Sequence, residues 1–223
     1  MPVPKTPAPV RPNRTPLSEV AYQHLLAQIS TGTLAAGAAI DDSAVAAELD
    51  MSPATVRQAI SRLVEIGLID MAPNRYTRVA EPSPARFIDT ITVAVALWRL
   101  GGHLFLQHCT PDLAAQFHDQ VQVVTDDIDT FTDGDVFIGS VLDVLDFLPN
   151  HSGNPVLIDT AGRLRPVIAH TARLGETAYD LPGTATLMTE LDNAVHNADP
   201  VALDAALTVI DRLADEFITR HNI

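Results

Sequence analysis

The fold is decided by residues 50–68, which have the sequence DMSPATVRQAISRLVEIGL and predict one well-bounded helix. Ser52 can accept a hydrogen bond from an unpaired N–H of the first turn, and Pro53 suits the first helical position, where no N–H is needed. Gly67 can adopt the positive φ that ends a helix, so we expect the helix to stop there. Apolar side chains recur at three- and four-residue spacing and predict one buried face, made of Val56, Ala59, Ile60, Leu63 and Val64.

The opposite face of this helix carries polar side chains that are long enough to reach phosphates and base edges. They are Thr55, Arg57, Gln58, Ser61 and Arg62. Two interpretations are open for such a face: an ordinary solvated helix surface, or a surface that reads DNA. The sequence on either side of the helix favours the second.

Upstream, Asp42-Ser43 is a capping signal for a short helix with Val45, Ala46 and Leu49 facing inward, and Asp50-Met51 then turns the chain into the next helix. Downstream, residues 68–71 and 76–79 are strand-like runs around Ala72-Pro73-Asn74-Arg75, a hairpin signal. Helix, turn, helix and hairpin together predict a winged helix within residues 16–80. The DNA contacts that we expect from it are Ser52, Thr55, Arg57, Gln58, Arg62, Asn74 and Arg75.

The chain has 223 residues, of which 47% are hydrophobic and only 5% aromatic, a balance that favours a helical globular protein. A single cysteine, Cys109, permits no internal disulfide, so we expect a reducing, cytoplasmic compartment. The most apolar run, Ile91 to Trp98, is too short to span a membrane. Residues 17–31 predict the first helix, because their apolar positions follow helical spacing up to Gly32; Gly32 and Gly37 then permit a tight turn.

Residues 1–15 are rich in proline and carry Lys5, Arg11 and Arg14 with no acidic residue. They lack the apolar centre of a signal peptide, and we interpret them as a flexible basic arm. The arm is either a tail with no role or a contact to phosphates or the minor groove. Residues 1–80 hold seven Lys or Arg and seven Asp or Glu, so the whole net charge of −14 belongs to residues 81–223. An acidic body behind a neutral head helps to aim the head at DNA.

Two prolines within Glu81 to Pro84 predict a linker, and a second domain then covers residues 85–223. Capping residues followed by proline mark several helix starts, at Thr110-Pro111, Asn154-Pro155 and Asp199-Pro200. The predicted helices cover about 85–106, 111–131, 135–148, 155–174, 184–197 and 200–220. The predicted fold class is therefore mainly α, with an N-terminal winged helix-turn-helix followed by an all-helical bundle.

Residues 17–79 resemble the winged-helix domain of the GntR family of bacterial transcription regulators. The resemblance rests on Gly32, Leu34 and Gly37, on Ala-Ala-Glu-Leu at 46–49, and on Ser52, Val56, Arg57, Ala59, Arg62-Leu63 and Gly67-Leu68. Family members usually carry further DNA-holding arginines where this chain has Ser43 and Pro53. Of the three arginines that the family tends to use, only Arg57 remains, and it is the first candidate for a base or phosphate contact.

The second domain resembles that of the FadR-like branch, a ligand-binding and dimerising bundle often called FCD. The residues that carry this resemblance are Ser152-Gly153-Asn154-Pro155-Val156-Leu157, Arg163 and Arg165, and the stretch from Ala194 to Asp199. The resemblance implies a homodimer that binds a roughly palindromic double-stranded DNA operator and responds to an effector. The metal ligands of many such domains fall here on Asp135, Gly139, Met188 and Ile210, of which only the aspartate suits a divalent ion. We therefore expect no metal and no cofactor.

For an effector in the bundle, a small carboxylate or phosphate is the first expectation, because arginine pairs bidentately with such anions. The candidate residues are Asp135, Arg163, Arg165 and His170. Two alternatives are open: the arginines pair with the many surface acids, or the pocket is filled by apolar residues.

We do not expect an enzyme, because no nucleophile elbow, phosphate loop or cysteine–histidine pairing is present. Acidic clusters such as Asp126-Asp127-x-Asp129 and Asp133-x-Asp135 lack the pattern of a calcium loop. Two rival hypotheses are a protein-interaction module whose winged helix no longer reads DNA, and an enzyme or metal carrier built on the acidic bundle.

Overall fold

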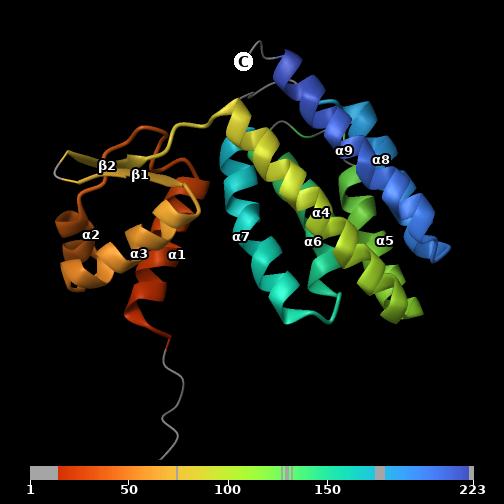
Figure 1. Cartoon of the computed structure of the whole chain (residues 1–223), viewed down its shortest axis with the longest axis horizontal. Coiled ribbons are helices and arrows are strands. Elements are labelled where there is room, and N and C mark those ends of the chain that lie inside the picture. The colour runs from red at the N-terminus through yellow and green to blue at the C-terminus, as the bar shows by residue number, and fades with distance from the viewer. Residues whose placement is uncertain are drawn as a thin grey trace, which may run out of the picture.

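The computed structural model describes residues 15–73, 75–126, 128, 131, 133–173 and 179–220. Within these ranges the chain forms two units that lie side by side, and the N-terminal unit contains a small sheet (Figure 1). The predicted mainly helical fold, with an N-terminal winged helix-turn-helix and a helical remainder, is confirmed. None of the helices in the described ranges combines the length and apolar content that a membrane span needs. The arm predicted for residues 1–15 lies, apart from Thr15, outside the described residues.

The N-terminal unit, called the head below, packs three helices against a two-stranded antiparallel sheet. Its elements are α1 (Leu17–Ser30), α2 (Asp42–Glu48), α3 (Pro53–Glu65), β1 (Ile69–Ala72) and β2 (Tyr76–Val79). Ile69 pairs with Val79 and Ala72 with Tyr76, which places the hairpin tip at residues 73–75. A single bridge from Ala39 to Arg78 joins the segment before α2 to the open edge of this sheet.

The local chemistry of α3 follows the prediction. The Ser52 hydroxyl accepts a hydrogen bond from the Thr55 backbone N–H at 3.2 Å, Pro53 occupies the first turn, and Gly67 has a φ of +70°. Val56, Ala59, Ile60 and Leu63 are buried, while Val64 is only half-buried. The helix therefore presents its polar face outward and anchors its apolar face in the head.

The cap of α2 differs from the prediction by one residue. Asp41, in an extended conformation, accepts hydrogen bonds from the backbone N–H groups of Ser43 and Ala44 at 2.8 and 3.2 Å. Asp42 already has helical geometry, so its carboxylate cannot reach the same N–H groups and points to α3 instead. Asp50 makes the predicted turn between α2 and α3 with a φ of +51°, which aspartate tolerates better than most residues.

The second unit is a bundle of helices around a long central helix. Its elements are α4 (Pro84–His108), α5 (Pro111–Asp126), α6 (Gly134–Asn150), α7 (Pro155–Ala172), α8 (Leu181–His196) and α9 (Pro200–Arg220). The prediction extended α5 to residue 131, but the helix ends at Asp126 in a run of acidic residues, and Asp133 caps the next helix. Helix α4 packs against α6, α7 and α9, and Phe87, Trp98 and Phe105 are among its buried side chains (Figure 1).

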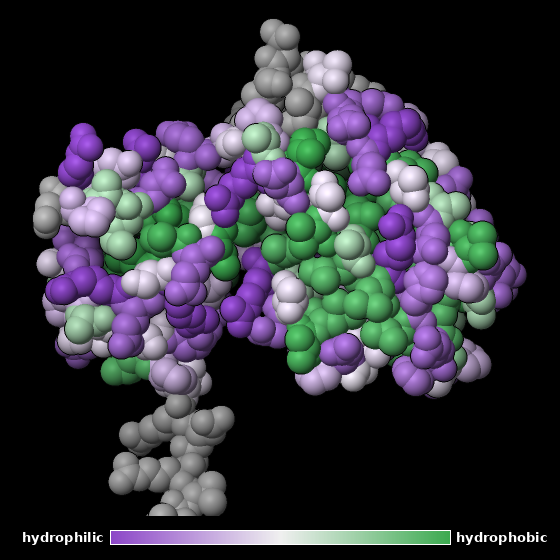
Figure 2. All heavy atoms as spheres, in the orientation of Figure 1, coloured by the Kyte–Doolittle hydropathy of each residue, from purple (hydrophilic) through white to green (hydrophobic). Residues whose placement is uncertain are grey.

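The outer face of α4 is apolar. Val93 and Leu100 are 51% and 48% exposed, and Ala96 lies between them on the same side of the helix. Figure 2 shows a broad green area on the helical unit, where Figure 1 places α4 nearest the viewer. This face is unusual for a solvated helix, since the solvent side of an amphipathic helix is normally polar.

Candidate nucleic-acid interface and effector sites

Arg57 and Gln58 project from the exposed face of α3. The Arg57 side chain is 65% exposed, and its Nε lies 2.7 Å from Oδ2 of Asp42 on α2. Ser52 and Thr55 stand at the start of the same helix, where their hydroxyl groups lie 2.9 Å apart. The Ser52 hydroxyl is thus engaged in capping, whereas the side chains of Arg57 and Gln58 are exposed at the surface of the head.

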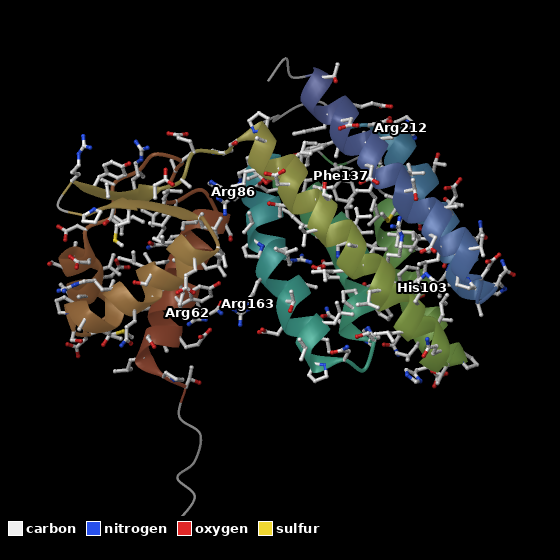
Figure 3. All side chains as sticks on the ribbon, viewed as in Figure 1. Arg62, Arg86, His103, Phe137, Arg163 and Arg212 are labelled. Carbon is white, nitrogen blue, oxygen red and sulfur yellow. The ribbon has the colours of Figure 1, made fainter. Side chains whose placement is uncertain are left out.

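Arg62 was predicted to face DNA, but its guanidinium is held by α1. Its Nη1 lies 2.7 Å from Oε2 of Glu19, and its Cζ lies 4.0 Å above the ring centre of Tyr22. Hydrogen bonds from Gln23 and Arg62 lower the pKa of the Glu19 carboxyl. Figure 3 shows Arg62 on the head and Arg163 on α7 on opposite sides of the space between the two units. A DNA contact by Arg62 would require this pairing to open.

The hairpin contributes Arg75 at its tip, where the side chain is exposed. Asn74, the other predicted hairpin contact, lies outside the described residues. The sequence analysis missed Arg78 on β2, whose guanidinium covers the ring of Tyr76 at 4.6 Å and lies 3.5 Å from Asp70. Strand periodicity could have found it, because residues 76 and 78 share one face of β2.

Most of the positive charge of the described head is compensated. Residues 15–80 hold four arginines and seven acidic residues. Within this part of the chain, Arg57, Arg62 and Arg78 each lie within 4.0 Å of a carboxylate, and only Arg75 does not. The remaining basic residues of the first 80 are Lys5, Arg11 and Arg14 of the predicted arm.

Comparisons with known proteins agree with this geometry. Residues 17–79 match the family model described as "Bacterial regulatory proteins, gntR family". The head is a winged helix of GntR type. No curated protein matches the chain in sequence.

Two solved structures extend the likeness to the helical unit. E. coli McbR/YncC is 19% identical, with a TM-score of 0.73 over 94% of this chain and 100% of that chain. A putative transcriptional regulator GntR from Rhodococcus sp. RHA1 is 18% identical, with a TM-score of 0.64 over 93% of this chain and 98% of that chain. At these identities the likeness establishes the fold, in which a GntR-type head precedes an all-helical unit.

A cleft of about 540 Å³ separates the GntR-type head from the helical unit. It is lined by Tyr22 and Leu26 of α1, and by three of the four residues predicted for an anionic effector, Asp135, Arg163 and Arg165. Arg173, which the sequence analysis missed, lines it as well. The fourth predicted residue, His170, does not, because its buried ring points to the Ala80 carbonyl instead of into the cleft.

Each arginine of this cleft already faces a carboxylate. Arg163 pairs with Asp159 at 2.8 Å, on its own helix. Arg165 lies 2.7 Å from Asp143 and 3.0 Å from Asp146, and its Nη2 also donates to the Gly139 carbonyl at 3.2 Å. Arg173 holds Asp135 at 2.6 Å. An anion would have to displace these carboxylates.

The four positions that correspond to the family's metal ligands have different surroundings. Asp135 lines the cleft, Gly139 offers its carbonyl to Arg165, Met188 is fully buried in the core, and Ile210 lines a separate cavity. In the described ranges, no group of three or more His, Cys, Asp or Glu side chains is arranged to hold a metal ion. That the protein binds no metal stays a prediction.

The separate cavity lies among α4, α6, α7, α8 and α9 of the bundle and is partly open to the surface, and the sequence analysis did not foresee it. Five aromatic side chains line it: Phe87, Trp98, Phe137, Tyr179 and Phe217. Figure 3 shows Phe137 directed into the interior of the helical unit. These residues come from four separate stretches of the chain, so no local sequence pattern predicts the cavity.

Three side chains of the helical unit hold backbone carbonyls of the head. Arg86 of α4 donates to the Ile66 carbonyl at 2.7 Å, and His170 lies 2.8 Å from the Ala80 carbonyl. Arg173 donates to the Ile29 carbonyl at 2.7 Å and also to that of Ser30. Ile29, Ser30 and Ile66 lie at the C-terminal ends of α1 and α3, where helix carbonyls favour cations. We call these three contacts the latches.

Proposed function

We propose that the protein is a homodimeric DNA-binding transcription regulator of the FadR-like branch, whose DNA affinity is set by an effector bound in the helical unit. Residues 16–80 are the DNA-binding domain and residues 85–223 the effector-binding and dimerisation domain. The observation that carries the proposal is the presentation of Arg57 and Gln58 on a capped, outward-facing α3. We assign it no enzymatic role and place it in the cytoplasm.

DNA binding by one head is expected to be modest. A phosphate or a base must compete with Asp42 for Arg57, and Arg75 is the one head arginine in the described ranges without a nearby carboxylate. Lys5, Arg11 and Arg14 of the arm supply the remaining charge. Two heads on two half-sites would double the contact area and provide the missing affinity.

The outer face of α4 is the proposed dimer interface. Val93, Ala96 and Leu100 form an apolar stripe that a second copy of the same helix can cover, since a two-fold axis brings equal surfaces together. The latches then connect each head to this dimer. A ligand that changes the latches would change the separation or orientation of the heads, and with it the fit to the operator.

The first experiment is a fluorescence-anisotropy titration with a random pool of duplexes and with DNA from the protein's own upstream region, at two salt concentrations. We expect selective binding that weakens as salt rises. Arg57→Ala should reduce binding to the selected DNA about five- to 150-fold, because a bidentate contact to a base is worth about 1–3 kcal/mol. Arg212→Ala is the matched control, since Arg212 is a similarly exposed arginine paired with an acid, on α9.

One observation favours the rival hypothesis of a protein-interaction module: three of the four arginines in the described head are paired with carboxylates. Absence of binding by the wild type at low salt would support that rival and reject the regulator. Loss of binding in Arg57→Ala with an unchanged dimer would reject the rival.

A further inference from the structure

The cavity inside the bundle has walls that are almost entirely apolar. Besides the five aromatic residues, its lining includes Ile91, Leu142, Leu145, Ile168, Leu187 and Ile210. Among the described residues that line it, none is Arg, Lys or His. An anionic group placed here would lose its hydration without gaining a cationic partner, which costs on the order of several kcal/mol.

Three of the four polar side chains of the lining are already engaged, and the fourth is the hydroxyl-bearing Thr184. The Trp98 Nε1–H donates to Oδ1 of Asp146 at 2.9 Å, and the Tyr179 hydroxyl donates to the Ala172 carbonyl at 3.2 Å. Burial raises the pKa of Tyr179 to about 12, so the hydroxyl stays neutral at physiological pH. Asp180 caps α8 by accepting from the Gly183 N–H at 3.1 Å. A ligand therefore meets mainly rings and aliphatic carbons.

The size of the cavity limits the ligand. Its volume is about 110 Å³. An engineered, enclosed apolar cavity of about 150 Å³ in another protein binds benzene, so a space of this order suits one six-membered ring. Edges and faces of the surrounding rings offer the stacked and edge-to-face contacts that aromatic ligands prefer.

We propose that this cavity binds an uncharged, apolar molecule of about the size of one aromatic ring. The inference rests on the proposed function, because it names the class of effector that the regulator senses. It differs from the small anion predicted from the sequence, for which the arginine-lined cleft stays the candidate site.

The position of the cavity links it to the latches. Ile168 and Ala172 of α7 line the cavity. Two latch residues lie beside them: His170 in the last turn of α7 and Arg173 directly after the helix. Trp98 and Ile91 line it from α4, the helix whose outer face is the proposed dimer interface. A ring that expands the cavity would press on both elements that set the position of the head.

Trp98 is the only tryptophan of the chain and is 2% exposed, so its fluorescence reports on the cavity and is shielded from quenchers in bulk water. The test titrates the full-length protein with bromobenzene, 4-bromobenzoate and 4-bromobenzylammonium, whose bromine quenches an indole in contact. We expect saturable quenching by bromobenzene, with at least tenfold weaker binding of both charged analogues. Equal or tighter binding of a charged analogue, or no saturable quenching by bromobenzene, overturns the proposal.

Two variants locate the site. Ala214→Leu adds three carbon atoms to the cavity wall and should abolish quenching, whereas Ala205→Leu, on an exposed position of the same helix, should not change it. Because Ala214→Leu can also disturb folding, Leu145→Ala serves as the complement: it enlarges the cavity and should admit 1-bromonaphthalene. Unchanged ligand selection in both cavity variants contradicts the assignment. The assay contains no DNA, so its failure is distinct from failure of the regulator proposal, which the anisotropy titration decides.

Discussion

Asp146 accepts hydrogen bonds from two donors at once, the buried Trp98 and the partly exposed Arg165. Its two carboxylate oxygens accept from Trp98 at 2.9 Å and from Arg165 at 3.0 Å, and the residue is 8% exposed. Burial raises the pKa of the Asp146 carboxyl, and the hydrogen bonds from Trp98 and Arg165 oppose that rise. One residue thus joins the wall of the apolar cavity to the arginine of the cleft.

Asp146→Ala should lower the free energy of unfolding by about 2–4 kcal/mol, because it leaves the Trp98 N–H unpaired and removes one partner of Arg165. Asp143→Ala is the control, since this exposed carboxylate pairs with the same arginine and its loss should cost less than about 1 kcal/mol. Urea unfolding at pH 7 measures both values. Equal costs for the two variants would show that the buried hydrogen bond to Trp98 contributes nothing.

His170 predicts a pH dependence of stability. Desolvation lowers its pKa, Arg173 and Arg86 lower it further, and the Ala80 carbonyl and Glu81 oppose the change. Because the folded-state pKa lies below the unfolded one, the unfolded chain binds more protons as pH falls. The stability that His170 contributes is therefore complete above about pH 6.5 and is lost as pH falls below it.

Comparison with His170→Gln, which keeps an N–H donor for the Ala80 carbonyl, isolates this effect. In urea unfolding, the wild type should lose stability relative to the variant between about pH 7.5 and pH 5.5, roughly one unit on either side of the ordinary histidine pKa of about 6.5. His118→Gln should give the opposite slope, because the hydrogen bond that His118 donates to the Asp192 carboxylate raises the pKa of His118. Parallel curves for the wild type and His170→Gln would contradict the assignment of His170 as a neutral latch.

At the scale of the element, α4 approaches α6 closely at a glycine. A Cβ added at Gly101 would lie 2.7 Å from the backbone N and Cα of Pro149, atoms that cannot rotate away. Gly101→Ala should therefore destabilise the protein by about 1–3 kcal/mol, as overpacking usually does. Gly162→Ala on α7 meets no atom within 4 Å and should be neutral or stabilise by up to about 1 kcal/mol. Thermal unfolding separates the two, and a stabilised Gly101→Ala would mean that the helices can move apart.

The proposed dimer interface on the outer face of α4 can be tested by substitution. Leu100→Glu should convert the dimer to a monomer, since a charge in an apolar two-fold interface meets its own copy. Val123→Glu, at a 58% exposed position on α5, should leave the dimer intact. Sedimentation velocity at several concentrations distinguishes the outcomes. A Leu100→Glu variant that stays dimeric would place the interface elsewhere.

The elements themselves were largely predictable, because their signals are local. Ser52 and Asn154 mark helix starts through their own side chains, and the structure uses both as caps. Asp41 was missed because three polar residues in a row, 41–43, each qualify as a cap, and only backbone geometry selects one. The ion pair of Arg62 was not predicted because its partner Glu19 is 43 residues away, and no periodicity reports such a contact. The cavity could not be predicted for the same reason, because its lining residues are far apart in the sequence.

The whole molecule behaves as a small head attached to an acidic body. The net charge of −14 lies in residues 81–223, so the body repels DNA and favours approach by the head. Replacing Lys5, Arg11 and Arg14 together by Gln should weaken DNA binding at every sequence and reduce the salt slope by up to about 3, close to 0.9 per lost phosphate contact. Anisotropy at several salt concentrations gives the slope. An unchanged slope would show that the arm makes no phosphate contact.

Arg173 makes one of the three latches between the helical unit and the head. Its guanidinium joins the last carbonyls of α1 to Asp135 of α6, and the side chain is 23% exposed. Arg173→Ala removes hydrogen bonds that a charged guanidinium donates, each worth about 1.5–3 kcal/mol. In the described ranges, no other side chain donates a hydrogen bond to these carbonyls of α1. Local opening at the end of α1 should then become roughly ten- to hundredfold more frequent.

Hydrogen exchange of the backbone amides at residues 29–32 measures that opening, and Arg163→Ala is the control. Arg163 lies in the same cleft but pairs with Asp159 on its own helix, so its removal should leave the exchange rates of α1 unchanged. If the latches transmit the state of the bundle, bromobenzene should raise exchange at the same amides in the wild type and add little in Arg173→Ala. If bromobenzene leaves the exchange rates of these α1 amides unchanged in the wild type, the ligand occupies the cavity without moving the head.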